Sequence, residues 1–305
     1  MTTRLKNILF LAVLGMLASA CSAASHAATI DGTHISDEDV FAIRATQPDA
    51  TAVGETFRGD LTTLIVTRAT SLAASADFGL DDMESDAARQ AFVATALPDE
   101  LAILNSVAAN QDLGPYAYDV VATQLAIRRA VASAIAHDPE FQQDIWDNDR
   151  DLLLEVCASH ILAPTEEEAQ AAKDRIDAGE DFAAVAGEVS LDQQSPGGAL
   201  PCPSSPARFV QPFSSVVATA PVGELTVPFE TEFGWHIVFV DSRAEPASFE
   251  EFVADPERWI PATRLASAYG LWRDEAVGRA NIYVRSQVGI WFPQADGIIA
   301  PPASP

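Results

Sequence analysis

Two short segments, Phe233-Gly234-Trp235-His236-Ile237-Val238 and Ser159-His160-Ile161-Leu162, are the strongest indication of the fold in this sequence. Both phrases are short and rich in apolar residues, a composition typical of strands. Each carries one histidine at a comparable position. Between them lie helical patterns, the pair Gly197-Gly198 and then Pro212-Phe213. We therefore expect the two imidazoles to meet on one sheet, beneath an apolar pocket.

The segment around these phrases predicts a small α+β domain over residues 153–243. Thr165 and Glu168 form a capping box that begins a helix, and Gly179 is suited to its C-terminal end. The remaining predicted elements are a strand at 152–162, a second helix from Asp181, a loop at 195–206, a short helix at 209–219, a turn at 223–225 that leads into a strand, and a last strand at 234–240.

The flanking regions have a different pattern. Residues 28–36 predict two short strands around a turn at Asp31-Gly32, with Ser36 as the N-cap of a helix. Helical patterns then fill a domain at 29–150, and a C-terminal helix and tail at 247–305 are expected to pack on it, with a last strand at 280–284. The sequence thus predicts an α+β domain inserted in a mostly helical module.

The composition argues against nucleic acid and anionic lipid as partners. The 305 residues include 18 Lys+Arg and 44 Asp+Glu, a formal net charge of -26. Nucleic-acid binding relies on cationic neutralisation of phosphates, and adsorption to anionic lipid needs basic residues as well. The acidic excess favours solubility, with a secondary preference for basic clients.

The first residues predict export. Arg4 and Lys6 precede the apolar run 8–17, which is too short to span a bilayer, so residues 1–20 read as a signal peptide. The residues before Cys21 resemble a bacterial lipobox, which implies lipidation of Cys21 and a membrane anchor, with 21–28 as a tether. Ordinary cleavage after Ala20 is the alternative.

The cysteine count leaves a second question open. If Cys21 carries lipid, Cys157 and Cys202 remain as an even pair that an oxidising compartment allows to form a disulfide. Two free, buried thiols are the alternative. A zinc site built from these cysteines and the two strand histidines lacks the ligand spacing that such sites show, so no metal and no cofactor is expected.

Residues 153–243 resemble the parvulin family of peptidyl-prolyl cis/trans isomerases, and the flanks are similar to the SurA/PrsA type of envelope foldase. The matching phrases keep the family's order over the whole domain: 158–162, 165–169, 178–182, 189–192, 197–200, 212–213, 228–231 and 233–238.

The resemblance implies roles for individual residues. It puts His160 and His236 side by side in the sheet, gives Asp192 the position of a family Asp or Cys, and places Thr231 in the histidine network. The residues implied to contact the substrate proline are Leu200, Phe209, Phe213 and Phe233. Without the resemblance, each histidine would be an ordinary half-buried strand residue and Asp192 an acid in a loop.

The expected function is isomerisation of X–Pro bonds in unfolded or nascent exported proteins, combined with chaperone action. Two departures from the family affect it. The chain has Ala199-Leu200-Pro201-Cys202-Pro203 where the family follows Gly-Gly with Asp-Leu-Gly, and Phe209 occupies a methionine-like pocket position. The alternative is a holdase whose inert parvulin domain only binds peptides.

Overall fold

The computed structural model describes residues 26–46, 54–293 and 297–301. The chain divides into a first unit, residues 1–131 with 269–305, and a second unit, residues 132–268. The predicted signal peptide and Cys21 lie outside the described residues. In the part of the chain that is described, no helix is long and apolar enough to cross a membrane.

The first unit begins with a hairpin of β1 (His26–Ile30) and β2 (Thr33–Ser36). The turn uses Asp31 and Gly32 at positive φ, as predicted. A third strand, β6 (Ile282–Val284), pairs antiparallel with β1, which gives the order β2-β1-β6. Because β1 begins at His26, the last three residues of the expected tether lie in a strand.

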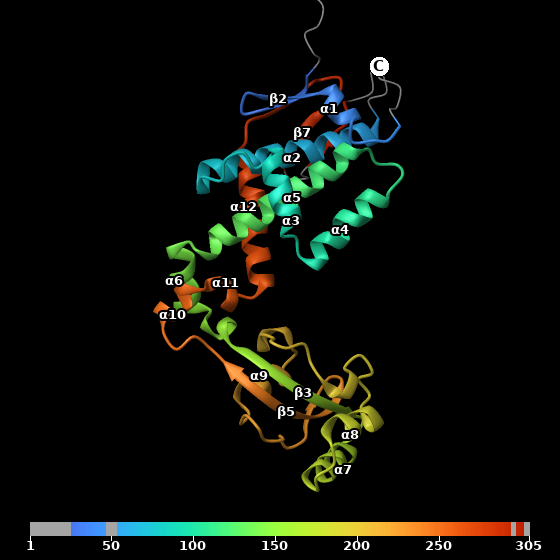
Figure 1. Cartoon of the computed structure of the whole chain (residues 1–305), viewed down its shortest axis with the longest axis vertical. Helices are drawn as coiled ribbons and strands as arrows, with labels where there is room; N and C mark the ends of the chain where they lie inside the picture. Colours follow the sequence, from blue (N-terminus) through green and yellow to red (C-terminus); the bar gives the residue numbers. More distant parts are fainter. Residues whose placement is uncertain (1–25, 47–53, 294–296, 302–305) are drawn as a thin grey trace, which may run out of the picture. The chain divides into compact units, whose positions relative to one another are not determined.

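Helices make up most of the first unit (Figure 1). Ser36 caps the first of them in a reciprocal capping box with Asp39. One apolar core joins the inner face of the sheet to α2 and α5. The helices are α1 (Asp37–Phe41), α2 (Glu55–Phe78), α3 (Asp86–Ala94), α4 (Pro98–Ala109), and most of α5 (Pro115–Ala136) and α12 (Ala262–Arg279), which both continue into the second unit.

The C-terminal segment contains a hairpin that the sequence analysis missed. Strands β7 (Ile290–Phe292) and β8 (Gly297–Ile299) pair antiparallel. Trp291 is buried in the core of the first unit, with Ile298 packed against that core. The packing of these two side chains on the core therefore explains why residues predicted to form a tail form strands instead.

The second unit contains an antiparallel sheet in the order β3-β5-β4, which confirms the α+β class. Its long strands are β3 (Glu155–Ala163) and β5 (Gly234–Ala244), and β4 (Phe229–Thr231) lies at the edge. The other elements are α7 (Glu166–Asp177), α8 (Phe182–Val189), α9 (Phe213–Thr219) and the 3-10 turns η1 (Arg150–Leu153), η2 (Pro196–Gly198) and η3 (Pro206–Arg208).

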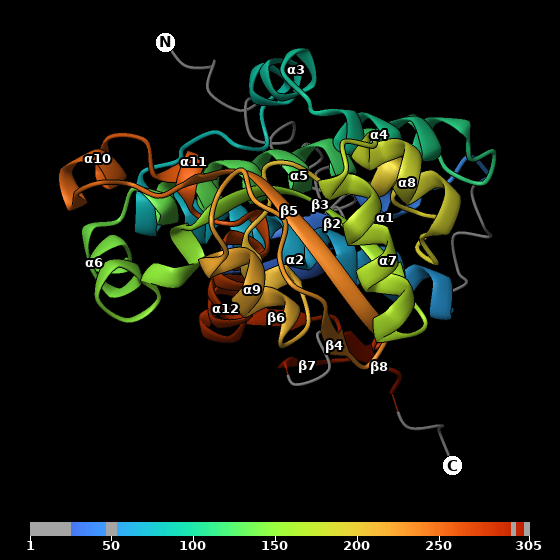
Figure 2. The ribbon, with the colours of Figure 1, turned by 90° about the horizontal axis from the view of Figure 1, so that it is seen from below.

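Helices cover both faces of this sheet. Helix α9 packs on the face that carries Val156, Ala158 and Val238. Helices α7 and α8 pack on the other face, against Ile161 and Ile237, near the Gly234 end of β5 (Figures 1 and 2). Residues of one strand alternate between the faces, so the register decides which side each histidine takes.

The turn at 223–225 leads into a strand as predicted, and that strand is β4. Gly223, at φ +84, makes the turn. Before β4 begins, the chain runs beside β5 through single bridges, Val222 parallel to Val240 and Leu225 antiparallel to Phe239.

The second unit is larger than the predicted domain. It also contains α6 (Pro139–Asn148), α10 (Phe249–Ala254) and α11 (Pro256–Trp259). These helices share a separate core in which residues before the sheet (Ala136, Ile145, Leu153) pack with residues after it (Phe252, Trp259, Ile260). The two chain segments that lead into and out of the sheet are thus held to each other.

Candidate functional site

The two histidines lie on neighbouring strands of one sheet face. In the β3–β5 ladder His160 pairs with Val238 and Leu162 pairs with His236, so the histidines are diagonal neighbours on the side of α9. Their rings stack with centroids 5.5 Å apart and planes 16° apart. Both residues are buried, with 6% and 4% of their surface exposed.

Hydrogen bonds join these rings into one chain of donors and acceptors. His160 Nε2 lies 2.8 Å from Asp192 Oδ2, and the two Nδ1 atoms lie 3.3 Å apart. At the other end Thr231 Oγ1 lies 2.8 Å from His236 Nε2 and accepts the N–H of Phe233. The structure therefore brings together His160, His236, Asp192 and Thr231.

The bonding pattern assigns the tautomers. A carboxylate only accepts, so His160 Nε2 carries a proton, and its Nδ1 accepts when the ring is neutral. The proton between the rings then belongs to His236 Nδ1, and His236 Nε2 accepts from the hydroxyl of Thr231. Every polar atom of both rings is satisfied with both rings neutral.

The charge state of His236 agrees with this assignment. Burial, followed by the repulsion of a protonated His160, lowers the pKa of His236 to about 4. The ring is therefore neutral near pH 7. A neutral ring with both nitrogens hydrogen-bonded is suited to holding the shape of a site rather than to exchanging protons.

Asp192 remains ionised at the same pH. The hydrogen bond from Ser195 Oγ, 2.7 Å from Oδ2, does most to lower its pKa, followed by those from His160 and the Gln194 N–H. Its side chain is 25% exposed. The sequence analysis missed Ser195, although a serine three residues after an acid is a common local hydrogen-bond partner.

Phe213 packs against both histidines within an apolar cluster. It is 4% exposed and presents an edge-to-face arrangement to both rings, with centroids 5.5 Å from His160 and 5.1 Å from His236. Phe209 packs on it at 5.2 Å. Leu200 packs against the same core and is half-buried.

Two further aromatic residues differ in their position. Phe229, which the sequence analysis did not select, stacks on His236 at 5.5 Å and lies 5.8 Å from Phe213. Phe233, which it did select, is 61% exposed. The signal in the sequence was the phrase Pro228-Phe229, close to the strand that carries His236. In the β4–β5 ladder Phe229 pairs with His236.

Gly198 permits the close approach of the following loop to the sheet. A Cβ at this position would lie 2.4 Å from the carbonyl oxygen of His160, and its φ of +79° is one that other residues rarely adopt. The Leu200 N–H then donates to the carbonyl of Ala158, 3.1 Å away. The loop that carries Leu200 is thus held directly on β3.

A disulfide fixes the same loop. Cys157 and Cys202 are bonded, with their Cα atoms 4.8 Å apart. Both sulfurs are used in this bond and the strand histidines bond each other, so these four residues do not form a metal-binding set.

Comparison with known proteins identifies this region. Residues 157–242 match the family model of the PPIC-type peptidyl-prolyl isomerase domain, or rotamase. These residues form a parvulin domain. The resemblance seen in the sequence is thereby confirmed for the region that carries the histidine network.

Curated relatives carry the name foldase protein PrsA. The chain is 28% identical over 156 residues to foldase protein PrsA 3 of Bacillus anthracis, covering 50% of this chain and 52% of that protein. It is 30% identical over 162 residues to PrsA of a Geobacillus species, covering 50% and 59%. The chain spans about half the length of the curated relatives it matches.

The solved structures that match this chain include a peptidylprolyl isomerase and a parvulin. A crystal structure of PrsA from Bacillus cereus is 22% identical and covers 88% of this chain and 96% of that one, with a TM-score of 0.39. The parvulin of Nitrosopumilus maritimus is 32% identical and covers 29% and 96%, with a TM-score of 0.27. Because these scores are low, we base the assignment on the family match.

Proposed function

We propose that the chain is a peptidyl-prolyl cis/trans isomerase and foldase that acts on unfolded or nascent exported proteins with X–Pro bonds. The observation that carries the proposal is the buried, hydrogen-bonded pair of His160 and His236 packed against Phe213, inside a domain that matches the PPIC-type family.

The chemistry needs no nucleophile. An X–Pro bond rotates against a barrier of about 20 kcal/mol that comes from amide resonance. Leu200, Phe209 and Phe213 would hold the pyrrolidine ring while the preceding carbonyl turns, and a dry site that favours the twisted amide lowers the barrier. We assign Asp192 to the carbonyl side, where its negative charge disfavours the planar form with charge on oxygen.

The remaining residues of the proposed site act indirectly, through the residues that contact the substrate. His160 and His236 would keep Asp192 and Phe213 in position, and Thr231 would fix the tautomer of His236. Phe233 is exposed enough to contact a peptide beyond the proline. No step uses a metal or a cofactor.

We further propose export and lipid anchoring. Residues 1–20 would be removed and Cys21 would carry a diacylglyceryl group that holds the protein at the outer side of a membrane, with the helical flanks 29–150 and 247–305 acting as the chaperone module. Mass spectrometry of the mature N-terminus tests the anchor. An unmodified Cys21, or a terminus created by cleavage after Ala20 without lipid, would exclude it.

An isomerisation assay on a proline peptide tests the activity. The mature chain should accelerate cis/trans exchange, and Phe213→Ser should abolish most of the gain because it removes the ring that packs against both histidines. A departure from the family pattern favours a holdase instead: Phe209 stands at a methionine-like position, and the prolines at 201 and 203 stiffen the loop. No acceleration, with aggregation of an unfolded client still suppressed, would decide for the holdase.

A further inference from the structure

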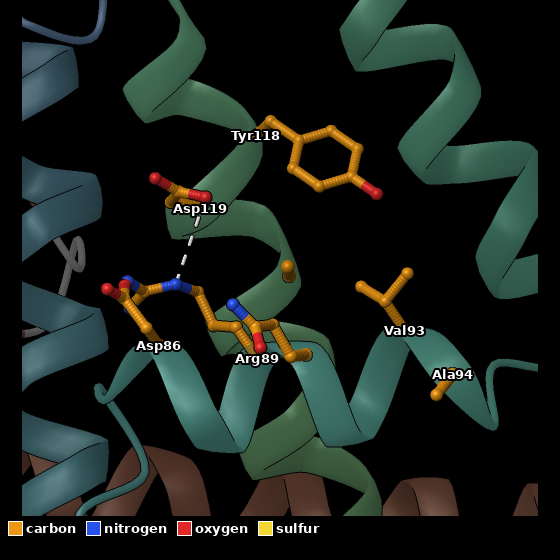
Figure 3. Close-up of a pocket in the computed structure, with 8 residues that line it drawn as sticks. Asp86, Arg89, Val93, Ala94, Tyr118 and Asp119 are labelled. Carbon is orange, nitrogen blue, oxygen red and sulfur yellow. Dashed lines mark hydrogen bonds and ion pairs between the residues drawn. The ribbon is translucent and has the colours of Figure 1, made fainter.

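The first unit contains a groove far in sequence from the proline site. It lies between α3 and α5 and has a volume of about 380 Å³. Pockets that bind ligands usually measure about 300–1,000 Å³, so this one accommodates a single large side chain. It is lined by Asp86, Arg89, Gln90, Val93, Ala94, Tyr118, Asp119 and Ala122 (Figure 3).

One end of the groove is apolar. Tyr118 from α5 and Val93 from α3 project into the same space in Figure 3. Both are partly buried and pack on a core that contains Phe92 and Ala122. The floor is therefore core, and a large apolar side chain in this space would bury its inner side against apolar atoms while its outer side stays open to solvent.

The other end of the groove is acidic. Arg89 is only 18% exposed at its side chain, hydrogen-bonds to Asp86 and lies 3.8 Å from Asp119 Oδ1. Its charge is thus neutralised within the groove. The carboxylates are more accessible, 84% for Asp86 and 47% for Asp119. The rim therefore presents excess negative charge with unused acceptor positions.

The spacing of the two ends suits an extended peptide. Along α3, Val93 follows Arg89 by four residues, so the apolar and acidic ends are about one helical turn, ~6 Å, apart. Residues i and i+2 of an extended chain lie about 6.6 Å apart on one side. One side chain can enter the recess while the next one on that side reaches the carboxylates.

We propose that this groove binds unfolded client segments in which a bulky apolar residue and a lysine or arginine stand two positions apart. The inference rests on the foldase proposal, because it gives the helical flanks a client site of their own. A net charge of -26 concentrates basic segments near the surface and repels acidic ones.

Fluorescence anisotropy with proline-free peptides tests the site on the mature full-length chain. A labelled peptide with phenylalanine and lysine two positions apart should bind. Serine in place of phenylalanine should weaken binding about tenfold or more, and glutamate in place of lysine more than a few-fold. Equal binding of all three peptides would overturn the proposal.

Matched variants locate the binding. Ala94→Trp should block the recess, whereas Ala87→Trp, on an exposed part of α3 outside the groove, should not. Asp119→Asn should weaken binding about two- to fivefold, and Asp99→Asn on α4 should leave it unchanged. Circular dichroism confirms that each variant is folded. Loss of binding in Ala87→Trp, or none in Ala94→Trp, would refute the site.

A photo-crosslinking residue in place of the phenylalanine gives an independent readout. Crosslinks should map to 86–94 and 118–122. Crosslinks confined to the parvulin domain, or self-association of the chain that Ala94→Trp removes, would contradict the proposal. The isomerisation assay is unaffected by these variants if both proposals hold. A chain without isomerase activity that still binds the peptide here fails only the catalytic proposal.

Discussion

Two histidine pairs of this chain have similar composition and different surroundings. His160 and His236 stack across two strands of the parvulin domain, with centroids 5.5 Å apart. His26 and His34 stack across the first hairpin at 4.0 Å. Each pair also touches a threonine hydroxyl. The first pair is buried and completely hydrogen-bonded, whereas the second is exposed to solvent.

The comparison teaches that surroundings, rather than residue types, make a histidine pair into a site. The hydrogen bonds to Asp192 and Thr231 fix the tautomers of the first pair, and burial lowers the pKa of His236. Water can replace any hydrogen bond of the exposed pair at little cost. Four experiments test this contrast, from the largest expected effect to the smallest.

The largest effect is expected for His236→Ala. The change leaves a cavity and removes the partners of Thr231 and His160, so the free energy of unfolding should fall by about 3–4 kcal/mol. Denaturant titration measures this loss. The isomerisation rate should fall as well; unchanged rate and stability would refute the buried pair as the centre of the site.

Loss of the disulfide should have the next largest effect. Cys157→Ala/Cys202→Ala frees the loop that carries Leu200, beside the buried pair, and should lower the free energy of unfolding by about 2–3 kcal/mol. Thermal unfolding of the variant, compared with the wild type before and after reduction, measures it. If reduction destabilises the wild type and leaves the variant unchanged, the loss comes from this bond.

Acid should destabilise the protein through His236. Its pKa is about 4 in the folded state against an ordinary value of 6.5, so below pH 6.5 the unfolded chain binds a proton that the folded chain does not. Stability should therefore fall by about 1–2 kcal/mol between pH 7 and pH 5. The lowered pKa of Asp192 acts only at more acidic pH. His236→Gln should flatten the slope; a slope equal to that of the wild type would argue against His236.

The smallest effect is expected at the exposed pair. His26→Ala/His34→Ala should change the free energy of unfolding by at most about 0.5 kcal/mol, since solvent replaces the lost contacts. The isomerisation rate should stay at the wild-type value. A loss comparable to that of His236→Ala would remove the distinction between the two pairs.

The sequence predicts the parts of this fold that depend on local patterns. Strand alternation places His160 on the face of Ala158 and His236 on the face of Val238, and the β3–β5 register makes this one face. Ser36, Asp31 and Gly32 mark the first hairpin and helix. Ser195 and Phe229 reach the site through loop and edge positions whose direction depends on tertiary contacts. The β7–β8 hairpin exists because Trp291 finds a core supplied by distant residues.

The pairing of β1 with β6 has a consequence for the order of assembly. Asp31 and Asn281, next to this pairing, are hydrogen-bonded although they stand 250 positions apart. A chain that is delivered across a membrane from its N-terminus presents β1 long before its partner strand. The parvulin domain is continuous in sequence, and domains fold as units when they emerge. It can therefore complete its sheet while the first strands still lack β6.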